Sequence, residues 1–162
     1  KRTVNGEGKD TDLYVSGHIY AKGNIEGARV YNMAYADIAE GYIPGEKLEP
    51  GDIVELRENG RVYKACLHNG FAAAVVGVIT DEYAACYGAS EKEIKNKEKV
   101  AVALVGRVHV KVDGPAYIGS AISASDVPGA GTSYENGIVI GRALETSKQC
   151  GVHKVLCLVR PC

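Results

Sequence analysis

Two carboxylic acids about a quarter of the way along the chain have a spacing that could support chemistry. Asp37 and Glu40 lie three residues apart in the stretch YADIAEGY, residues 35–42. In a helical turn this spacing places both side chains on one face. Asp37 is then either an N-cap completed by Glu40 as a capping box, or the two carboxylates interact and titrate apart, so that one acts as a base and the other donates a proton. Spacing alone favours capping, because such pairs are common and their chemistry is rare.

A second group of residues suits a metal by type. Cys150, His153, Cys157 and Cys162 form a C-x2-H-x3-C-x4-C string, whose side chains can bind zinc, but the spacing is not a usual zinc pattern. Residues 154–160 alternate like a strand, which would make Cys157 a small buried hydrophobic residue beside Val155 and Val159. No phosphate-binding loop or nucleophile elbow is recognisable. We therefore predict no metal and no cofactor.

Composition limits the possible partners. Among 162 residues, 46% are hydrophobic and 24% charged, which is typical of a globular protein, and the net charge of −1 gives no general attraction to nucleic acid or anionic lipid. No apolar run approaches the roughly 20 residues that span a bilayer, so we expect no membrane insertion. Five irregularly spaced cysteines indicate assembly in a reducing compartment. Because the sequence starts without Met, we expect a fragment of a longer chain.

The residues before Asp37 predict a stalk. From Leu13 a six-residue repeat runs through Ile19 and Ile25, with glycines at matching positions. Such repeats are typical of short strands that stack as a β-helix or β-prism. Three rungs from one chain bury too little apolar surface to offset the entropy of ordering them. Residues 1–36 are therefore predicted to form a β-stalk that other chains complete, most simply in a closed symmetric oligomer. A pair of ordinary hairpins at a domain edge is the alternative.

Residues 37–162 predict a compact β-rich head, and the whole protein is expected to be all-β. Many short strands at close spacing favour a β-sandwich or barrel, and the lack of long amphipathic helices argues against a Rossmann-type fold. A stretch of mixed charge, residues 90–99, is expected to be a loop or one helical turn. The strands are predicted over residues 52–56, 61–65 after an Asn59-Gly60 turn, 72–80, 100–112, 138–144 and 154–159.

Several short strings, taken in order, resemble the C-terminal domain of phage tail fibres and tailspikes. The resemblance implies a homotrimeric fibre end that promotes chain assembly, a place in the virion as part of the phage tail, and assembly in the cytoplasm of the host bacterium. Exposed tyrosines and loop tips would contact a host-surface receptor or glycan. The strings are YVSG (14–17), IYAKGNI (19–25), ADIAE (36–40), EPGDIV (49–54), VGVI (76–79), VALVGRV (102–108), VKV (110–112) and IGRALE (140–145).

One branch of this group is similar in a further way. It is the autoproteolytic intramolecular-chaperone domain of phage neck appendages and tailspikes, in which an Asp-x-x-Glu motif carries self-cleavage just before the Asp. The resemblance implies a scissile bond between Ala36 and Asp37, with Asp37 and Glu40 as catalytic carboxylates. Ile38 stands where an aromatic residue would be expected. A structural, trimer-promoting role is therefore the leading hypothesis, and self-cleavage is the alternative.

Overall fold

The computed structural model describes Lys22 and residues 37–67, 74–133 and 138–160. The chain divides into two units, Lys1–Tyr31 and Asn32–Cys162. Apart from Lys22, the predicted stalk lies outside the described residues, as does Ala36, so both remain predictions. All of the described strands and the described helix belong to the second unit.

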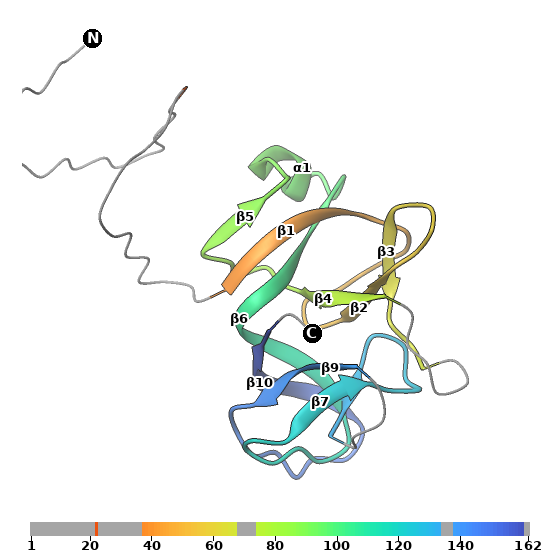
Figure 1. The fold of residues 1–162 in the computed structure, drawn as a ribbon, viewed down its shortest axis with the longest axis vertical. Coiled ribbons are helices and arrows are strands. Elements are labelled where there is room, and N and C mark those ends of the chain that lie inside the picture. Colours follow the sequence, from red (N-terminus) through yellow and green to blue (C-terminus); the bar gives the residue numbers. More distant parts are fainter. Residues whose placement is uncertain (1–21, 23–36, 68–73, 134–137, 161–162) are drawn as a thin grey trace, which may run out of the picture. The chain divides into compact units, whose positions relative to one another are not determined.

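The regular secondary structure in the described part of this unit is all β-strand apart from one short helix, which confirms the all-β class. It contains no helix long and apolar enough to cross a membrane. The elements in chain order are β1 Asp37–Pro44, β2 Ile53–Leu56, β3 Arg61–Lys64, β4 Val75–Ile79, β5 Ala85–Tyr87, α1 Glu91–Lys95, β6 Val100–Asp113, β7 Ala121–Ala124, β8 Gly131–Thr132, β9 Val139–Ala143 and β10 Val152–Val159 (Figure 1).

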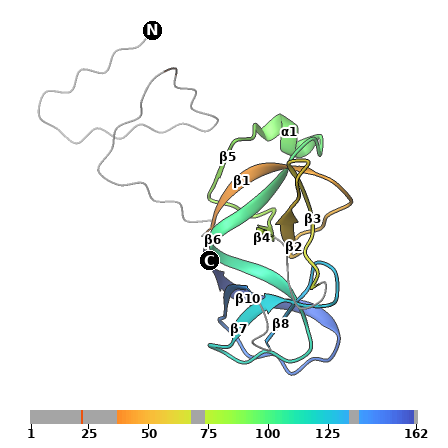
Figure 2. The same cartoon turned by 45° about the vertical axis from the view of Figure 1, so that its right-hand side comes forward.

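The strand pairings close two five-stranded rings that share β6. The N-terminal ring joins the first half of β6 to β4, β2, β3 and β1, which pairs back with β6. The C-terminal ring joins its second half to β8, β7, β9 and β10, which also returns to β6. Figures 1 and 2 show β6 running through both groups of strands. A β-sandwich or a barrel was expected for the head. The closed rings are closer to a barrel, and there are two of them instead of one.

Gly106 is the point where β6 passes from one ring to the other. It lies opposite Asp37, the first residue of β1, and also opposite Val159, the last residue of β10. Its φ of 128° is one that residues with a side chain rarely adopt. The first residue of the described head therefore sits at the junction between the rings.

Local sequence explains several elements. Asn59 and Gly60 turn β2 into β3 as predicted, with Gly60 at a φ of 71° and the Arg57 amide donating to the Arg61 carbonyl at 3.1 Å. The charged stretch before β6 forms α1, where Ser90 is the N-cap and Glu93 completes a capping box. The helical turn considered for residues 90–99 is therefore confirmed.

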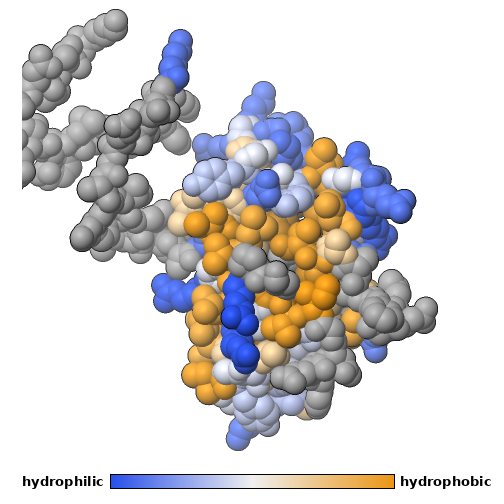
Figure 3. Space-filling view, viewed as in Figure 1, coloured by the Kyte–Doolittle hydropathy of each residue, from blue (hydrophilic) through white to orange (hydrophobic). Residues whose placement is uncertain are grey.

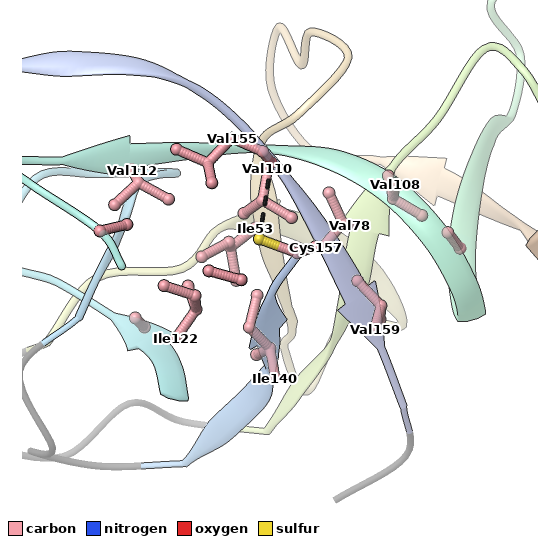
Figure 4. Close-up of a cluster of buried hydrophobic side chains, with 14 of the residues drawn as sticks. Ile53, Val78, Val108, Val110, Val112, Ile122, Ile140, Val155, Cys157 and Val159 are labelled. Atoms are coloured by element: carbon pink, nitrogen blue, oxygen red, sulfur yellow. Dashed lines mark hydrogen bonds between the residues drawn. The ribbon is translucent and has the colours of Figure 1, made fainter. Parts of the chain in front are cut away.

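Each ring has its own hydrophobic core, and the strands between them are buried on both faces. Along β2, Ile53 contacts the core of the C-terminal ring, whereas its neighbour Val54 contacts that of the N-terminal ring. On β4, Val78 likewise contacts the core of the C-terminal ring and Ile79 that of the N-terminal ring. This confirms the strand predicted within residues 72–80 as buried on both faces. Figure 4 shows the core of the C-terminal ring, which includes Val108, Val110, Val112, Ile122, Ile140, Val155, Cys157 and Val159.

An ionic network also joins the rings. Asp52, which is 1% exposed, accepts a hydrogen bond from Lys111 Nζ on β6 at 2.7 Å, and Lys64 Nζ lies 3.8 Å from its other oxygen. Lys111 also pairs with Glu49 at 3.1 Å. His109 is exposed and Lys111 turns away from the core, as the alternation predicted. That Lys111 neutralises a buried carboxylate was not foreseen.

Candidate functional site

Asp37 and Glu40 lie in a strand, so the helical turn expected for them is wrong. Both belong to β1, which is held on one side by β6 and on the other by β5. Pairing along both edges satisfies the backbone groups that a helix would satisfy internally, which outweighs a local capping pattern. Successive side chains in a strand point to opposite faces. Residues three apart therefore diverge, and the structure does not place these two carboxylates on one face.

Asp37 is the buried member of the pair. It is 1% exposed, and neither carboxylate oxygen has a hydrogen-bond partner of good geometry among the described residues. Burial raises the pKa of Asp37 above its ordinary value of 3.8, although the Thr80 hydroxyl favours the charged form. The negative charge of Glu82 adds to the rise. A carboxyl group of this kind can hold or release a proton closer to neutral pH than an exposed one.

Glu40 has a separate, half-buried environment. Its Oε2 accepts a hydrogen bond from the Tyr42 hydroxyl at 2.8 Å on the same strand. Burial, together with this bond to the Glu40 carboxylate, raises the pKa of Tyr42 to about 12. Glu40 is thus engaged as an acceptor on the face away from Asp37.

Three described residues that interact with Asp37 come from the turn between β4 and β5. The Ala84 amide donates to the Asp37 carbonyl at 2.9 Å, and Thr80 and Glu82 influence its side chain. None of the three was predicted from the sequence, because they lie more than forty residues from Asp37 and belong to no recognisable motif. The end of the predicted strand at Thr80 was the only local sign of a turn there.

The cysteine and histidine string does not converge on a metal site in the part of the chain that the structure describes, where no cluster of three or more candidate ligands occurs. Cys150 is exposed, and His153 lies with Nδ1 3.0 Å from the Gly151 carbonyl. Cys157 is fully buried, as predicted, and burial raises the pKa of its thiol to about 12. Cys162 lies outside the described residues.

Two surface clefts accompany the site. A polar cleft of about 540 Å³ is lined by the turn at Thr80 and Glu82 and by charged residues of β6 and β10, including Arg107, His109 and Lys154. A second cleft, of about 440 Å³, has a more apolar lining that includes Leu48, Ile79, Tyr83, Ile94 and Val100. The polar cleft is thus open to the turn that carries Thr80 and Glu82.

No family model matches the chain, and no curated protein is similar to it in sequence. Its fold is similar to that of two solved structures from bacteriophage phi29. One is the pre-mature bacteriophage phi29 gene product 12, with a TM-score of 0.64 and 18% identity over 86% of this chain. The chain spans only 24% of that protein. The other is the C-terminal fragment of gene product 12, with a TM-score of 0.58 and 18% identity; the match covers 76% of this chain and 100% of the fragment. At this level of identity the likeness is one of fold.

Proposed function

We propose that this chain is the C-terminal part of a phage appendage protein of the tail fibre or tailspike type, and that its head promotes assembly of a homotrimer. The observation that carries the proposal is the shared fold, which extends over the whole C-terminal fragment of phi29 gene product 12. In such a protein the head would bring three chains together so that the preceding repeats can form a stalk.

The surface of the head supports a role in association. Apolar residues gather on one face, seen in Figure 3 as a broad orange area. On the surface of β1 and β6, Ile38 is 44% exposed and lies opposite Val105, which is 37% exposed. Exposed apolar patches of this kind mark interaction surfaces.

Native and denaturing mass measurements test this role on a chain extended upstream of Lys1. The expected result is a trimer, with stalk order lost when residues 37–162 are deleted. A monomer, or a stalk that folds in the absence of the head, contradicts the proposal. The control is a chain of residues 32–162, which lacks the stalk and keeps the second unit whole. This chain should still form a trimer.

Attachment to a host-surface receptor or glycan is part of the same proposal. Tyr117 and Ile118 stand in the turn before β7 and are 52% and 70% exposed, and Tyr87 at the end of β5 is 64% exposed. Rigid aromatic side chains on loop tips suit recognition. Binding of the trimer to host cell envelopes should weaken in a Tyr117→Ser variant that remains trimeric, and equal binding by both would argue against these tips.

The second candidate function is self-cleavage between Ala36 and Asp37, and the burial of Asp37 favours it. An acid with a raised pKa at the first residue of the fold is suited to act only once the head has folded around it. The test is denaturing mass spectrometry of the upstream-extended chain. Self-cleavage predicts a fragment beginning at Asp37 that Asp37→Asn abolishes. The same fragment in that variant would identify an outside protease.

A further inference from the structure

Three exposed apolar side chains meet on the outer surface of the head where the two rings join. Ile38 on β1 is 44% exposed, Val105 on β6 is 37% exposed and Leu158 on β10 is 43% exposed. Ile38 lies directly opposite Val105, and Leu158 lies opposite Arg107, the next residue but one on β6. Opposite residues share a face of the sheet, and alternate residues of one strand return to it. Ile38, Val105 and Leu158 therefore form one patch, the junction patch.

The strands beneath the junction patch are already paired. Around Ile38, β1 pairs with both β5 and β6, and Gly106 of β6 pairs with both β1 and β10. Among the described strands, the patch therefore offers a sheet face and not a strand edge. A partner can cover such a face only by packing its side chains against it.

Polar and charged residues surround the junction patch. Along the outer face of β6, Val105 is followed at alternate positions by Arg107 and His109, which are both exposed. On the turn after β4, Asp81 and Glu82 are exposed and line the polar cleft together with Arg107. An apolar centre inside a polar rim is the usual composition of a protein–protein interface. Figure 3 shows apolar residues across the middle of the head, at the level where β6 passes between the rings in Figure 1.

The position of Asp37 indicates what covers the patch. Asp37 is the first residue of β1 and lies beside Ile38 and opposite Gly106, so the preceding chain enters the head next to the patch. In the proposed homotrimer, three chains that share one stalk have to enter their heads close to the three-fold axis. The surface beside that entry then faces the other two copies.

We propose that a second copy of this chain docks on the junction patch, so that three copies meet around the start of their β1 strands. This inference rests on the proposed homotrimer and names the surface that holds it together. The patch takes side chains from β1 of the N-terminal ring and from β10 of the C-terminal ring, so each copy contacts its neighbours through both rings. Docking removes these apolar side chains from water, which favours association.

The first test compares two isoleucines on one strand. Ile38 and Ile43 both lie on β1 and are both 44% exposed in the single chain, but Ile43 lies opposite Arg61 of β3, away from the patch. The isoleucine methyl groups of the native assembly of residues 1–162 are labelled, and their relaxation by a soluble gadolinium chelate is measured by NMR. The Ile38 methyl groups should be relaxed several-fold less than those of Ile43. Equal relaxation of the two in a trimer overturns the proposal.

The second test substitutes the patch and measures the trimer by native mass spectrometry over a dilution series. Ile38→Lys should raise the concentration at which half of the chains are trimeric by about thirtyfold, the scale of a central interface residue. Leu158→Lys should have a similar effect from the other ring. The matched control, Ile43→Lys, should leave that concentration unchanged. Urea unfolding checks that each variant is folded, and Ile38→Ser and Leu158→Ser replace a lysine variant that is not.

The outcomes separate this inference from the homotrimer itself. If the patch variants form a trimer as stable as that of the parent, or if Ile43→Lys weakens the trimer as much as they do, the junction patch is not the interface and the homotrimer stands. If the parent stays monomeric at every concentration, both the homotrimer and this interface are overturned.

Discussion

The two rings are built on the same plan but bury different kinds of residues. Each closes on β6 through four antiparallel pairings and one parallel pairing. The C-terminal ring encloses a large apolar core whose buried polar residues are the uncharged Ser123 and Ser125. The buried carboxylates among the described residues, Asp37, Asp52 and Glu55, all belong to the N-terminal ring or the loop that leads into it.

The N-terminal ring therefore holds the buried groups that are costly to the stability of the fold. A buried carboxylate costs free energy unless it is paired, and Asp37 has no well-formed hydrogen bond while Glu55 pairs only one of its oxygens, with Arg57 at 2.9 Å. The N-terminal ring has a smaller fully buried core, centred on Val54, Val62, Ile79 and Val102. We infer that the apolar C-terminal ring supplies the stability that allows an unfavourable acid to persist at the junction.

The largest expected effect comes from opening a cavity in the C-terminal ring. Ile122 is fully buried in its core, and Ile122→Ala should lower the free energy of unfolding by about 2–5 kcal/mol, through lost burial and the cavity that remains. Ile118→Ala is the control, since Ile118 is 70% exposed and its truncation should change stability by less than about 0.5 kcal/mol. Urea unfolding measures both. Similar losses of unfolding free energy in the two variants would show that the core of the C-terminal ring contributes no more to stability than the surface does.

The ionic network that joins the rings should give the next largest effect. Among the described residues, Lys111→Met leaves the buried Asp52 with Lys64, 3.8 Å away, and the Glu49 amide as its side-chain partners. We expect a loss of about 1–3 kcal/mol, because the remaining carboxylate keeps most of its desolvation cost. Lys95→Met is the matched control, because the Lys95–Glu91 pair is exposed and contributes little. Equal stability of Lys111→Met and the parent would show that the rings do not depend on this network.

Asp37→Asn should stabilise the head at neutral pH by about 1 kcal/mol, because a neutral amide avoids the cost of ionising a buried carboxyl group. Because the folded-state pKa of Asp37 is raised, the folded head binds more protons than the unfolded chain above the ordinary value of 3.8. The penalty is absent below that value, grows as pH rises from it to the folded-state pKa, and is constant at higher pH. Thermal unfolding from about pH 3 to about pH 8 should therefore show the gain vanishing in acid. A gain that is constant with pH would exclude Asp37 as its source, and Asp81→Asn, which is exposed, serves as the control.

The smallest effect concerns Glu40. Tyr42→Phe removes the 2.8 Å hydrogen bond to Glu40 and should cost about 0.5 kcal/mol. Glu40→Gln should lower the Tyr42 pKa from about 12 but leave it above 10, since burial is the larger cause. The phenolate absorbance of the parent minus that of Tyr42→Phe isolates this titration from the other tyrosines. If Glu40→Gln leaves the pKa of Tyr42 unchanged, Glu40 does not interact with the Tyr42 hydroxyl.

Sequence alone predicted the elements whose signal is local. The Asn59-Gly60 turn, the alternation of Val155, Cys157 and Val159 on β10, and the continuous apolar run of β4 each depend on neighbouring residues, and the structure confirms them. These predictions hold because side-chain period and turn chemistry are properties of a few consecutive residues. The resemblance to phage appendages likewise agrees with the fold of phi29 gene product 12.

Tertiary structure decided the candidate site, as two similar patterns show. Ser90 and Glu93 lie three apart and form a capping box, because their stretch is polar and has no apolar partner strand. Asp37 and Glu40 have the same spacing, yet their stretch is a strand, because β5 and β6 pair with it on both sides. Pairing partners more than forty residues away determined which way Asp37 points and brought Thr80 and Glu82 to it. The sequence specified that an acid stands at residue 37, and long-range strand pairing decided that it is buried and which groups act on it.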